Sequence, residues 1–272
     1  MEWFYVNGQF VERSQATIPV DQTGIARSFG IFDLFRTVNG QPRFFEDYLR
    51  RFSNSQRFLD LSRQIEEEEI RIAVTGLQER NGYDHSTFKM VLLGDGPDGA
   101  PVYDPFFYIM NFPLASQRPA GVKVITHEYV REFAEVKSLN YFTTFALTRK
   151  KAAAQAAEVI YHKDNLVSEA SRCNVFVIRD GVLSTTTQHI LHGITRMHVI
   201  EAAKQIMEVR LEDLSPSDLM EADEVFITST TKDVMPVTHI DGQVVGTGKP
   251  GDMSSKLQKT FEDYFLDKVI VA

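Results

Sequence analysis

Two ionisable residues stand in segments made mostly of apolar or small residues. Lys137 lies in AEVKSLNY, residues 134–141, and Glu169 lies in VSEASRCNVF, residues 167–176. A lysine amine can form an imine with an aldehyde, and a carboxylate can keep a ring nitrogen protonated. Each residue alone would be read as a solvated surface group, because charged side chains are seldom buried. Together they indicate chemistry on a phosphorylated aromatic cofactor, provided that the chain also offers a phosphate site.

Two segments offer groups for a phosphate. The stretch HGITRMHVIEAA, residues 192–203, predicts a helix that begins near Gly193, so the backbone N–H groups of Ile194 and Thr195 and the helix dipole favour a bound anion. The stretch FITSTTKD, residues 226–233, ends a predicted strand in four hydroxyl residues. Helix capping would also explain Thr195, and turn formation would also explain the hydroxyls.

Three other patterns carry no such chemistry. GDGPDG, residues 94–99, has the spacing of a dinucleotide fingerprint, but the residues that follow cannot open a helix, so a turn between strands is expected. GTGKPG, residues 246–251, lacks the first glycine of a phosphate loop and has Pro250 where Ser or Thr must stand. His189 and His192 have no carboxylate or cysteine at ligand spacing, and we expect no metal site.

Short strands and helices must position these residues. In the first half, two Asn-Gly turns predict hairpins, the periodicity from Glu46 to about Arg80 predicts two helices joined near Asp60, and a strand pair follows. In the second half, strands alternate with an alanine-rich helix over about 141–157, a helix from Gly193 and a closing helix. The result is a mixed α/β (α+β) chain. We expect a domain over 1–115, a linker over 116–121 and a second domain over 122–272.

Charge and composition limit the classes of partner. The 272 residues carry a net charge of −8, which argues against a broad nucleic-acid surface. The single cysteine excludes an internal disulfide framework and favours the cytoplasm. No basic region followed by a long apolar stretch occurs near the start, and no run of about 18 uncharged apolar residues occurs elsewhere, so we expect no membrane insertion.

The same segments resemble a known family, the class IV pyridoxal-phosphate aminotransferases. This family includes D-amino acid transaminases, branched-chain aminotransferases and aminodeoxychorismate lyases. The resemblance implies a small N-terminal α/β domain, a larger C-terminal domain with a pseudo-barrel of strands flanked by helices, and a homodimer. The segments that carry it are GIFDLFRTVNGQPRFFEDYLRRF (30–52), KSLNY (137–141), DNLVSEASRCNVFVIRDGVL (164–183), GITR (193–196) and FITSTTKDVMPV (226–237).

By position, the resemblance implies a role for each residue of these motifs. Lys137 would form the imine with pyridoxal 5′-phosphate and then act as the general base, and Glu169 would contact the pyridine nitrogen. Tyr141 would bond to the phenolic oxygen of the cofactor. The implied phosphate ligands are Arg51, Ile194, Thr195, Ser229 and Thr230; a shift of one residue would exchange Arg51 for Arg50.

The resemblance implies an amino acid and a 2-keto acid as the substrates. The best-known D-amino acid transaminases hold the carboxylate with an arginine and a histidine two residues apart, but TFKMVLLGDG, residues 87–96, has no such pair. Arg27 and Arg172 are our candidates for that role, with Phe32 also on the substrate side, although either arginine can be a structural ion-pair residue. D-amino acid transamination is the first expectation, followed by branched-chain L-amino acid transamination, which Tyr141 favours. An aminodeoxychorismate lyase and a catalytically silent relative are further alternatives.

Overall fold

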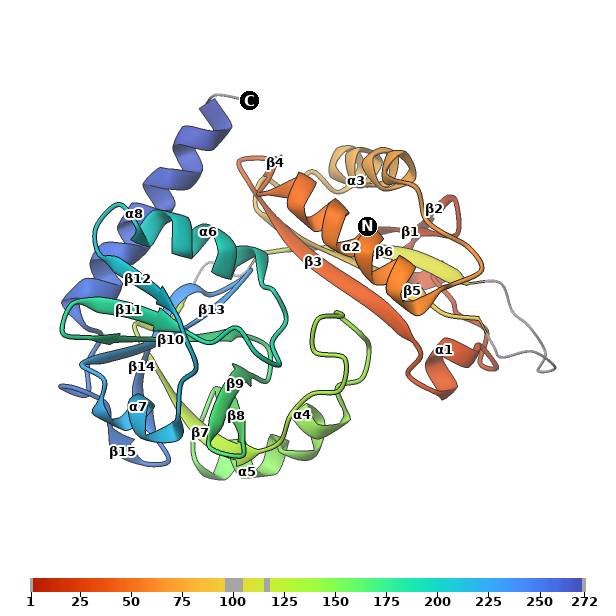
Figure 1. Ribbon diagram of the computed structural model, residues 1–272. Helices are drawn as coiled ribbons and strands as arrows, with labels where there is room; N and C mark the ends of the chain where they lie inside the picture. Colours follow the sequence, from red (N-terminus) through yellow and green to blue (C-terminus); the bar gives the residue numbers. More distant parts are fainter. Residues whose placement is uncertain (1, 96–104, 115–117, 271–272) are drawn as a thin grey trace. The chain divides into compact units, whose positions relative to one another are not determined.

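The computed structural model describes residues 2–95, 105–114 and 118–270 and divides the chain into two compact units (Figure 1). The first unit comprises Met1–Ser116 and Val136–Tyr141, and the second comprises Gln117–Glu135 and Phe142–Ala272. Both units combine strands and helices, which confirms the mixed α/β class. Residues 115–117, which span the expected boundary between the first domain and the linker, and residues 96–99 of the GDGPDG turn lie outside the described part.

The first unit contains a six-stranded sheet with the order β2-β1-β6-β5-β3-β4. Its two predicted Asn-Gly hairpins are confirmed: Asn7 and Gly8 have φ of 41° and 89°, and Asn39 and Gly40 have φ of 50° and 72°. Tight hairpin turns need this left-handed backbone, which Asn and Gly adopt most readily. The strands are β1 (Trp3–Val6), β2 (Gln9–Glu12), β3 (Gly30–Val38), β4 (Gln41–Pro42), β5 (Ser86–Leu93) and β6 (Phe106–Pro113).

Helices cover one face of this sheet. The predicted helix pair is confirmed as α2 (Phe45–Leu59) and α3 (Glu67–Asn81), and the first helix ends at Asp60, whose φ is 50°. α2 packs on β3, and α3 packs on β1, β2 and β6, because both helices bury apolar stripes. Alternate residues of β3, among them Phe32 and Leu34, lie on the other face and are only partly buried. The 3-10 turn η1 (Arg13–Gln15) and the short α1 (Thr23–Ala26) complete the unit.

The second unit contains a nine-stranded curled sheet, which confirms the expected pseudo-barrel. Its order is β12-β11-β10-β13-β14-β7-β8-β9, with β15 paired to β14. The strands β8 and β10 are buried almost throughout, as expected for strands covered on both faces. The strands are β7 (Val122–Glu128), β8 (Glu158–Lys163), β9 (Leu166–Ala170), β10 (Asn174–Arg179), β11 (Val182–Thr185), β12 (Glu208–Leu211), β13 (Glu224–Ser229), β14 (Asp233–Ile240) and β15 (Gln243–Val244).

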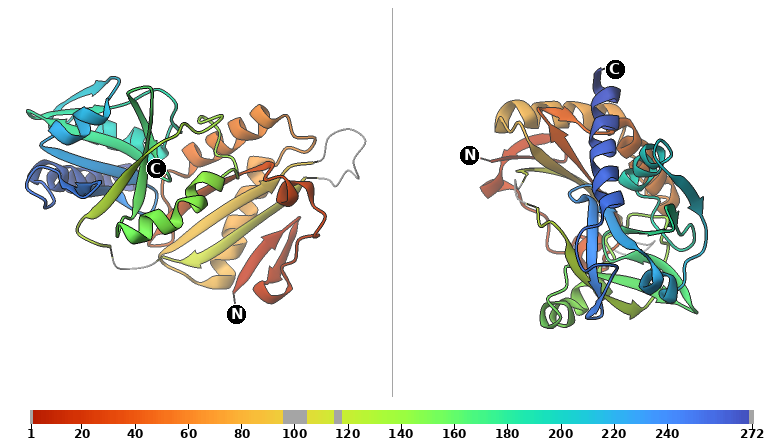
Figure 2. Two further views of the ribbon diagram at one scale, coloured as in Figure 1. Left: turned by 90° about the horizontal axis from the view of Figure 1, so that it is seen from below. Right: turned by 90° about the vertical axis from the view of Figure 1, so that its left-hand side faces the viewer.

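The longer helices of the second unit, α6 (Ile194–Ala203) and α8 (Asp252–Ile270), lie side by side and pack on β13 (Figure 2). A capping box at Ser215 begins the short α7 (Pro216–Glu221). α6 begins directly after Gly193, its N-cap residue, which confirms the predicted start of a helix there. Within the described residues, every helix is too short or too polar to span a lipid bilayer.

The prediction of one alanine-rich helix over 141–157 is wrong. The segment forms α4 (Phe142–Ala146) and α5 (Thr148–Ala153), interrupted at Leu147, and Gln155 then adopts a left-handed φ of 52°. Neither helix has a buried residue. Alanine propensity alone rarely sustains a helix without an apolar face that packs against the rest of the protein, so the segment breaks into short turns.

The segment Val136–Tyr141 groups with the first unit, although the sequence assigned it to the second domain. The Phe32 N–H donates to the Lys137 carbonyl at 2.9 Å, and the Leu139 N–H donates to the Gly30 carbonyl at 3.0 Å. Ser138 forms an antiparallel bridge with Ile31. These bonds add the lysine segment to the start of β3, so Lys137 is held by a long-range backbone pairing that local patterns do not reveal.

Candidate active site

Lys137 lies against the partly exposed face of the first unit's sheet. Its Nζ is 4.7 Å from the centroid of the Phe32 ring, and the Tyr141 ring meets the same ring edge to face at 5.5 Å. Lys89 of β5 also lies over Phe32, at 5.1 Å, and burial lowers the pKa of Lys89. The structure thus brings together three of the predicted residues, Lys137, Tyr141 and Phe32, within one unit.

Arg51 lies close to this cluster and forms a buried bidentate pair with Asp33. Its Nε and Nη2 donate to Asp33 Oδ2 and Oδ1 at 2.9 and 2.6 Å. Burial favours the neutral form of Arg51, but Asp33 outweighs it, and Tyr141 adds to the attraction, so the pKa of Arg51 is raised. The neighbouring Arg50 is exposed and pairs with Asp47. The sequence reasoning overlooked Asp33, although a carboxylate in the apolar run GIFDLF is a readable signal.

Glu169 is the penultimate residue of β9 in the second unit, and its carboxylate accepts hydrogen bonds from two donors. Arg131 Nε donates to Glu169 Oε1 at 2.8 Å, and the Leu191 N–H donates to Oε2, also at 2.8 Å. Both side chains of the ion pair are nearly buried, with exposed fractions of 11% for Arg131 and 7% for Glu169. A carboxylate has about four lone-pair sites, so Glu169 retains capacity for another donor such as a ring N–H. Arg131 was missed because it stands 38 positions earlier, without a local signal.

The start of α6 is shaped as an anion cradle. Gly193 is the N-cap residue and has no side-chain cap, so its helix end keeps backbone donors for a ligand. Asn174 Nδ2 donates to the Leu191 carbonyl at 2.8 Å and closes one side. A Cβ on Gly193 would lie 2.1 Å from Asn174 Oδ1, so any other residue would require the Asn174 side chain to move. Ile194 and Thr195 are both buried at this end of the helix.

The end of β13 lies beside the α6 cradle. Asn174 is paired in register with Thr228, which places the end of β13 beside the residue that closes the α6 cradle. Thr228 Oγ1 and Ser229 Oγ are buried without a hydrogen-bond partner among the described residues. The Cys173 thiol, which lies beside Ser229, is only a weak hydrogen-bonding group. Buried hydroxyls without partners are costly, and an anion at this position would satisfy them. Thr230 follows directly and is half-buried.

The two candidate carboxylate ligands have different surroundings. Arg172, in the second unit, is half exposed and donates from Nη2 to Glu158 Oε1 at 2.8 Å. Arg27, in the first unit, is exposed and caps the C-terminus of α1. The described contact of Arg172 is therefore an ion pair, the structural role that the sequence left open.

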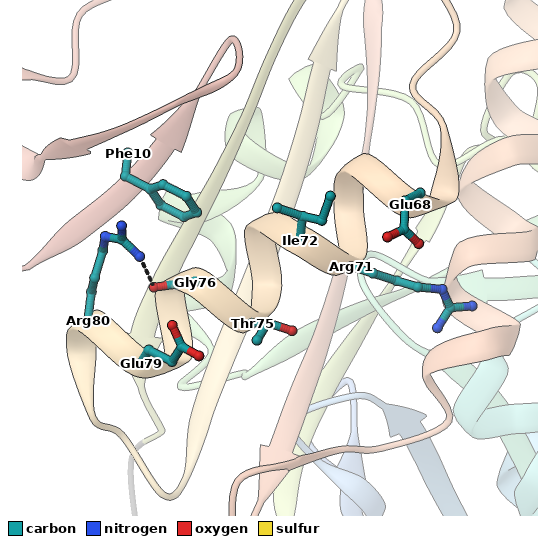
Figure 3. A pocket seen from close by; sticks show the side chains of 8 residues that line it. All are labelled: Phe10, Glu68, Arg71, Ile72, Thr75, Gly76, Glu79 and Arg80. Carbon is teal, nitrogen blue, oxygen red and sulfur yellow. Dashed lines mark hydrogen bonds between the residues drawn. The ribbon is translucent and has the colours of Figure 1, made fainter.

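A surface groove runs along α3 (Figure 3). None of the predicted site residues lines it, so it has no part in the chemistry considered above. The lining residues are Phe10, Glu68, Arg71, Ile72, Thr75, Gly76, Glu79 and Arg80. In the part of the chain that the structure describes, no group of three or more His, Cys, Asp or Glu residues could hold a metal ion.

Known proteins resemble the chain over almost its whole length. Residues 30–240 match the family described as amino-transferase class IV. The D-alanine aminotransferase of Listeria monocytogenes serotype 4b (strain F2365) is 32% identical, over 98% of this chain and 96% of the relative. That of Bacillus licheniformis is 30% identical, over 96% of each.

Solved structures agree with this similarity. The T.th. branched-chain amino acid aminotransferase with pyridoxamine 5′-phosphate superposes with a TM-score of 0.89 at 25% identity, over 96% of this chain and 93% of that one. The Escherichia coli branched-chain amino acid aminotransferase has a TM-score of 0.88 at 23% identity, over 97% of this chain and 94% of that one, and shares the fold.

Proposed function

The chain belongs to the class IV aminotransferases and is therefore an enzyme, and on this premise we propose that it moves an amino group between a D-amino acid and a 2-keto acid with pyridoxal 5′-phosphate as its cofactor. One observation carries the proposal. The segment 191–195 supports both a buried carboxylate and an anion cradle: the Leu191 N–H holds Glu169, and two residues later Gly193 begins α6. A ring nitrogen and a phosphate of one cofactor need such a pair of sites.

The residues present fit this cofactor. Ser229 offers a buried hydroxyl whose described neighbour is the weakly hydrogen-bonding Cys173 thiol, and the α6 cradle offers the N–H groups of Ile194 and Thr195, which suit a phosphate. Arg51 and Thr230 complete the proposed phosphate ligands. The cation Arg51, rather than Arg50, is favoured because the side chain of Arg51 is nearly buried, whereas that of Arg50 is exposed.

The reacting groups follow from the same fit. When bound, pyridoxal phosphate supplies an electron sink for the carbanion formed at the substrate Cα. Glu169, kept in place by Arg131, holds a proton at the ring nitrogen. The Tyr141 hydroxyl donates to the phenolic oxygen of the cofactor. In the first half-reaction, Lys137 Nζ takes the proton from Cα of the amino acid. In the second half-reaction, it delivers a proton to the corresponding carbon of the 2-keto acid. Phe32, 4.7 Å from Lys137 Nζ, orients the amine and limits the space beside it.

D-amino acids are the favoured substrates because the relatives that are 30–32% identical over nearly the whole chain are D-alanine aminotransferases. Arg27 and Arg172 are the proposed ligands of the substrate carboxylate, since planar guanidinium groups bind carboxylates well. Branched-chain L-amino acids are the second candidate. The edge-to-face contact of Tyr141 with Phe32 and the similarity to the T.th. enzyme favour it.

We also propose a cytoplasmic homodimer. Three large aromatic side chains of the second unit are strongly exposed: Phe133 at 65%, Phe142 at 81% and Phe145 at 74%. Large aromatic side chains exposed to this degree are typical of an interaction surface. Sedimentation of the purified protein would test the dimer, which a monomer at all concentrations would contradict. The single cysteine, which is buried and free, suits a reducing compartment.

Half-reactions with single amino acids test the proposed function. The visible spectrum of the bound cofactor should change on addition of D-alanine or D-glutamate and stay constant with L-leucine. A change with L-leucine alone would establish the branched-chain alternative. Lys137→Ala is the matched negative control, because without the amine neither amino acid should be processed.

A further inference from the structure

Lys89 lies in the middle of the sheet of the first unit, on the face that also carries Phe32. It is paired in register with Leu34 of β3 and with Met110 of β6, so a strand lies on each side of it. Its Nζ is 5.1 Å from the centroid of the Phe32 ring, and Lys137 Nζ is 4.7 Å from the same centroid. A partly buried lysine with apolar neighbours on both sides is uncommon, because its charge loses contact with water.

The charge of Lys89 has no acidic partner within the described part of the chain. Its described contact is the Phe32 ring, and burial lowers the pKa of its amine. None of the positions of β3, β5 and β6 on this face is Asp or Glu. Asp33, the acidic residue of these strands, lies on the opposite face and pairs with Arg51. An anion from outside the chain is therefore the natural counter-ion of Lys89.

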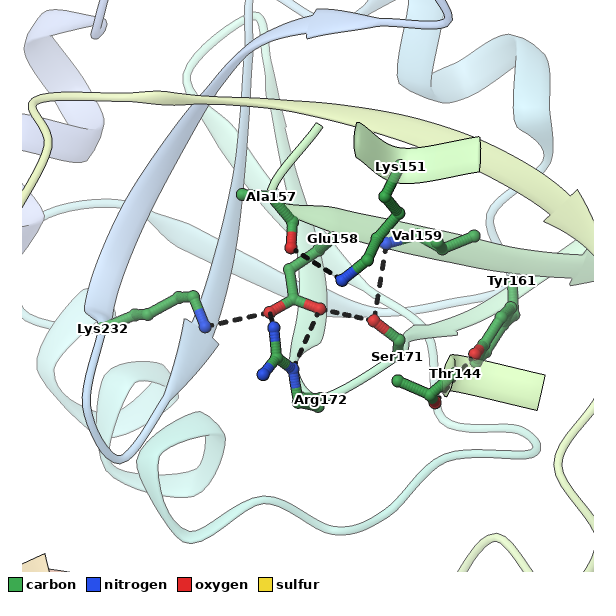
Figure 4. Close-up of polar contacts among 9 residues, drawn as sticks. All are labelled: Thr144, Lys151, Ala157, Glu158, Val159, Tyr161, Ser171, Arg172 and Lys232. Carbon is green, nitrogen blue, oxygen red and sulfur yellow. Dashed lines mark hydrogen bonds and ion pairs between the residues drawn. The ribbon is translucent and has the colours of Figure 1, made fainter. Parts of the chain in front are cut away.

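Two other partly buried lysines, both in the second unit, do have acceptors (Figure 4). Lys232 Nζ donates to Oε1 of the buried Glu158 at 3.0 Å, and Lys151 Nζ donates to the Ala157 carbonyl at 3.4 Å. Such partners offset the loss of water that burial imposes on an ammonium group. Lys89 has no comparable acceptor among the residues that the structure places, so a ligand that supplies one best explains its burial.

The amine of Lys137 determines where the substrate must lie. In the proposed function, Lys137 Nζ removes the proton from the substrate Cα, and the carboxylate is bonded to that same carbon. Lys137 and Lys89 lie over one aromatic ring, so an amino acid whose Cα faces Lys137 presents an anionic group near this ring. An ammonium group binds a carboxylate by a charge-assisted hydrogen bond, which is stronger where water is partly excluded.

We propose that Lys89 binds the carboxylate attached to Cα of the amino acid and the corresponding carboxylate of the 2-keto acid. The inference rests on the proposed function, to which it adds a cation that the sequence reasoning did not consider. A solvated lysine whose aliphatic stem only covers Phe32 would explain the same distance between cation and ring. The two explanations differ in whether Lys89 contributes to the affinity for a carboxylate.

Titration of the holoenzyme with propionate tests this difference without turnover. Propionate is D-alanine without its amino group, so it can occupy the carboxylate site but cannot react, and calorimetry measures its Kd. Lys89→Met keeps the length and the apolar stem of the side chain but removes the charge. In this variant the Kd for propionate and the KM for D-alanine should both rise about tenfold, while kcat should change less than about twofold. Lys89→Arg retains the charge and should keep the Kd within about threefold of the wild-type value.

Lys123→Met is the matched control. Lys123 is also a strand lysine, in β7 of the second unit, but it is exposed, so its loss should leave Kd and KM unchanged. An equal rise of Kd in Lys123→Met and Lys89→Met would show an effect of net charge alone and would overturn the proposal. If Lys89→Met fails to fold, Lys89→Gln replaces it with the same expected rise, because it also removes the charge.

The outcomes separate this inference from the proposed function. An unchanged Kd for propionate in Lys89→Met would overturn the role of Lys89. A shift in the pH dependence of kcat with an unchanged Kd would assign Lys89 to the ionisation of Lys137 and would also overturn it. A wild-type protein that binds propionate through Lys89 but does not process D-alanine would contradict the proposed function alone.

Discussion

Arg131 should stabilise the apoprotein more than any exposed ion pair of the same length. Arg131→Met removes the only side-chain donor described for Glu169 and leaves a carboxylate that is 7% exposed with the Leu191 N–H. Breaking a buried pair by removing one partner costs about 3–5 kcal/mol. We expect about 3 kcal/mol, because the Leu191 N–H still donates. With an unfolding entropy of about 2 cal/mol/K for each of the 272 residues, this corresponds to a fall in Tm of about 5 °C.

Thermal unfolding of the apoprotein, followed by calorimetry, measures this change without any contribution from the cofactor. Arg179→Met is the matched control, because Arg179 pairs with Glu221 at the same 2.8 Å but the two side chains are 51% and 57% exposed. Exposed pairs contribute about 0–1 kcal/mol. Adding Glu169→Gln to Arg131→Met should restore part of the loss, because a neutral amide needs no counter-ion. Equal falls in Tm for Arg131→Met and Arg179→Met would refute the reasoning.

Two further substitutions and one measurement of thiol reactivity test other parts of the molecule. Glu169→Gln should keep the cofactor bound but slow removal of the Cα proton by about a hundredfold or more, and unchanged half-reaction rates would remove Glu169 from this role. Gly193→Ala should weaken binding of pyridoxal phosphate about tenfold in a spectroscopic titration, because its Cβ would lie 2.1 Å from Asn174 Oδ1; wild-type affinity would show that the cradle can shift. Burial raises the pKa of Cys173 to about 11, so the native thiol should not react with a disulfide reagent at pH 8 and should react after unfolding, whereas rapid native reaction would contradict its burial.

Local sequence signals predicted the turns and helix limits well. The hairpin turn at Asn39 and Gly40 requires a left-handed backbone. Asn and Gly adopt this backbone more readily than other residues, so the sequence predicted the hairpin directly. The helix pair before and after Asp60 followed from apolar periodicity. The alanine-rich segment 141–157 failed, because propensity says nothing about whether a helix finds a surface to pack on.

The contacts that the sequence did not predict join residues that lie far apart along the chain. Glu169 could be selected from its motif, but its partner Arg131 is separated from it by most of two strands and two short helices. Arg172 was selected as a candidate for substrate binding, whereas its contact with Glu158 depends on how β8 lies beside the turn after β9. Such pairings depend on sheet order, and sheet order is not contained in a local pattern.

The attachment of Lys137 to β3 limits how this protein can be recombined. The Lys137 carbonyl accepts a hydrogen bond from the Phe32 N–H, and the Leu139 N–H donates to the Gly30 carbonyl. The lysine segment and the start of β3 therefore form one structural unit, although about a hundred residues separate them in the sequence. A chimaera made by joining halves of two relatives at 116–121 would combine the lysine segment of one parent with the β3 of the other. Successful crossovers would therefore have to carry residues 136–141 together with β3, so the functional modules of this enzyme are discontinuous along its gene.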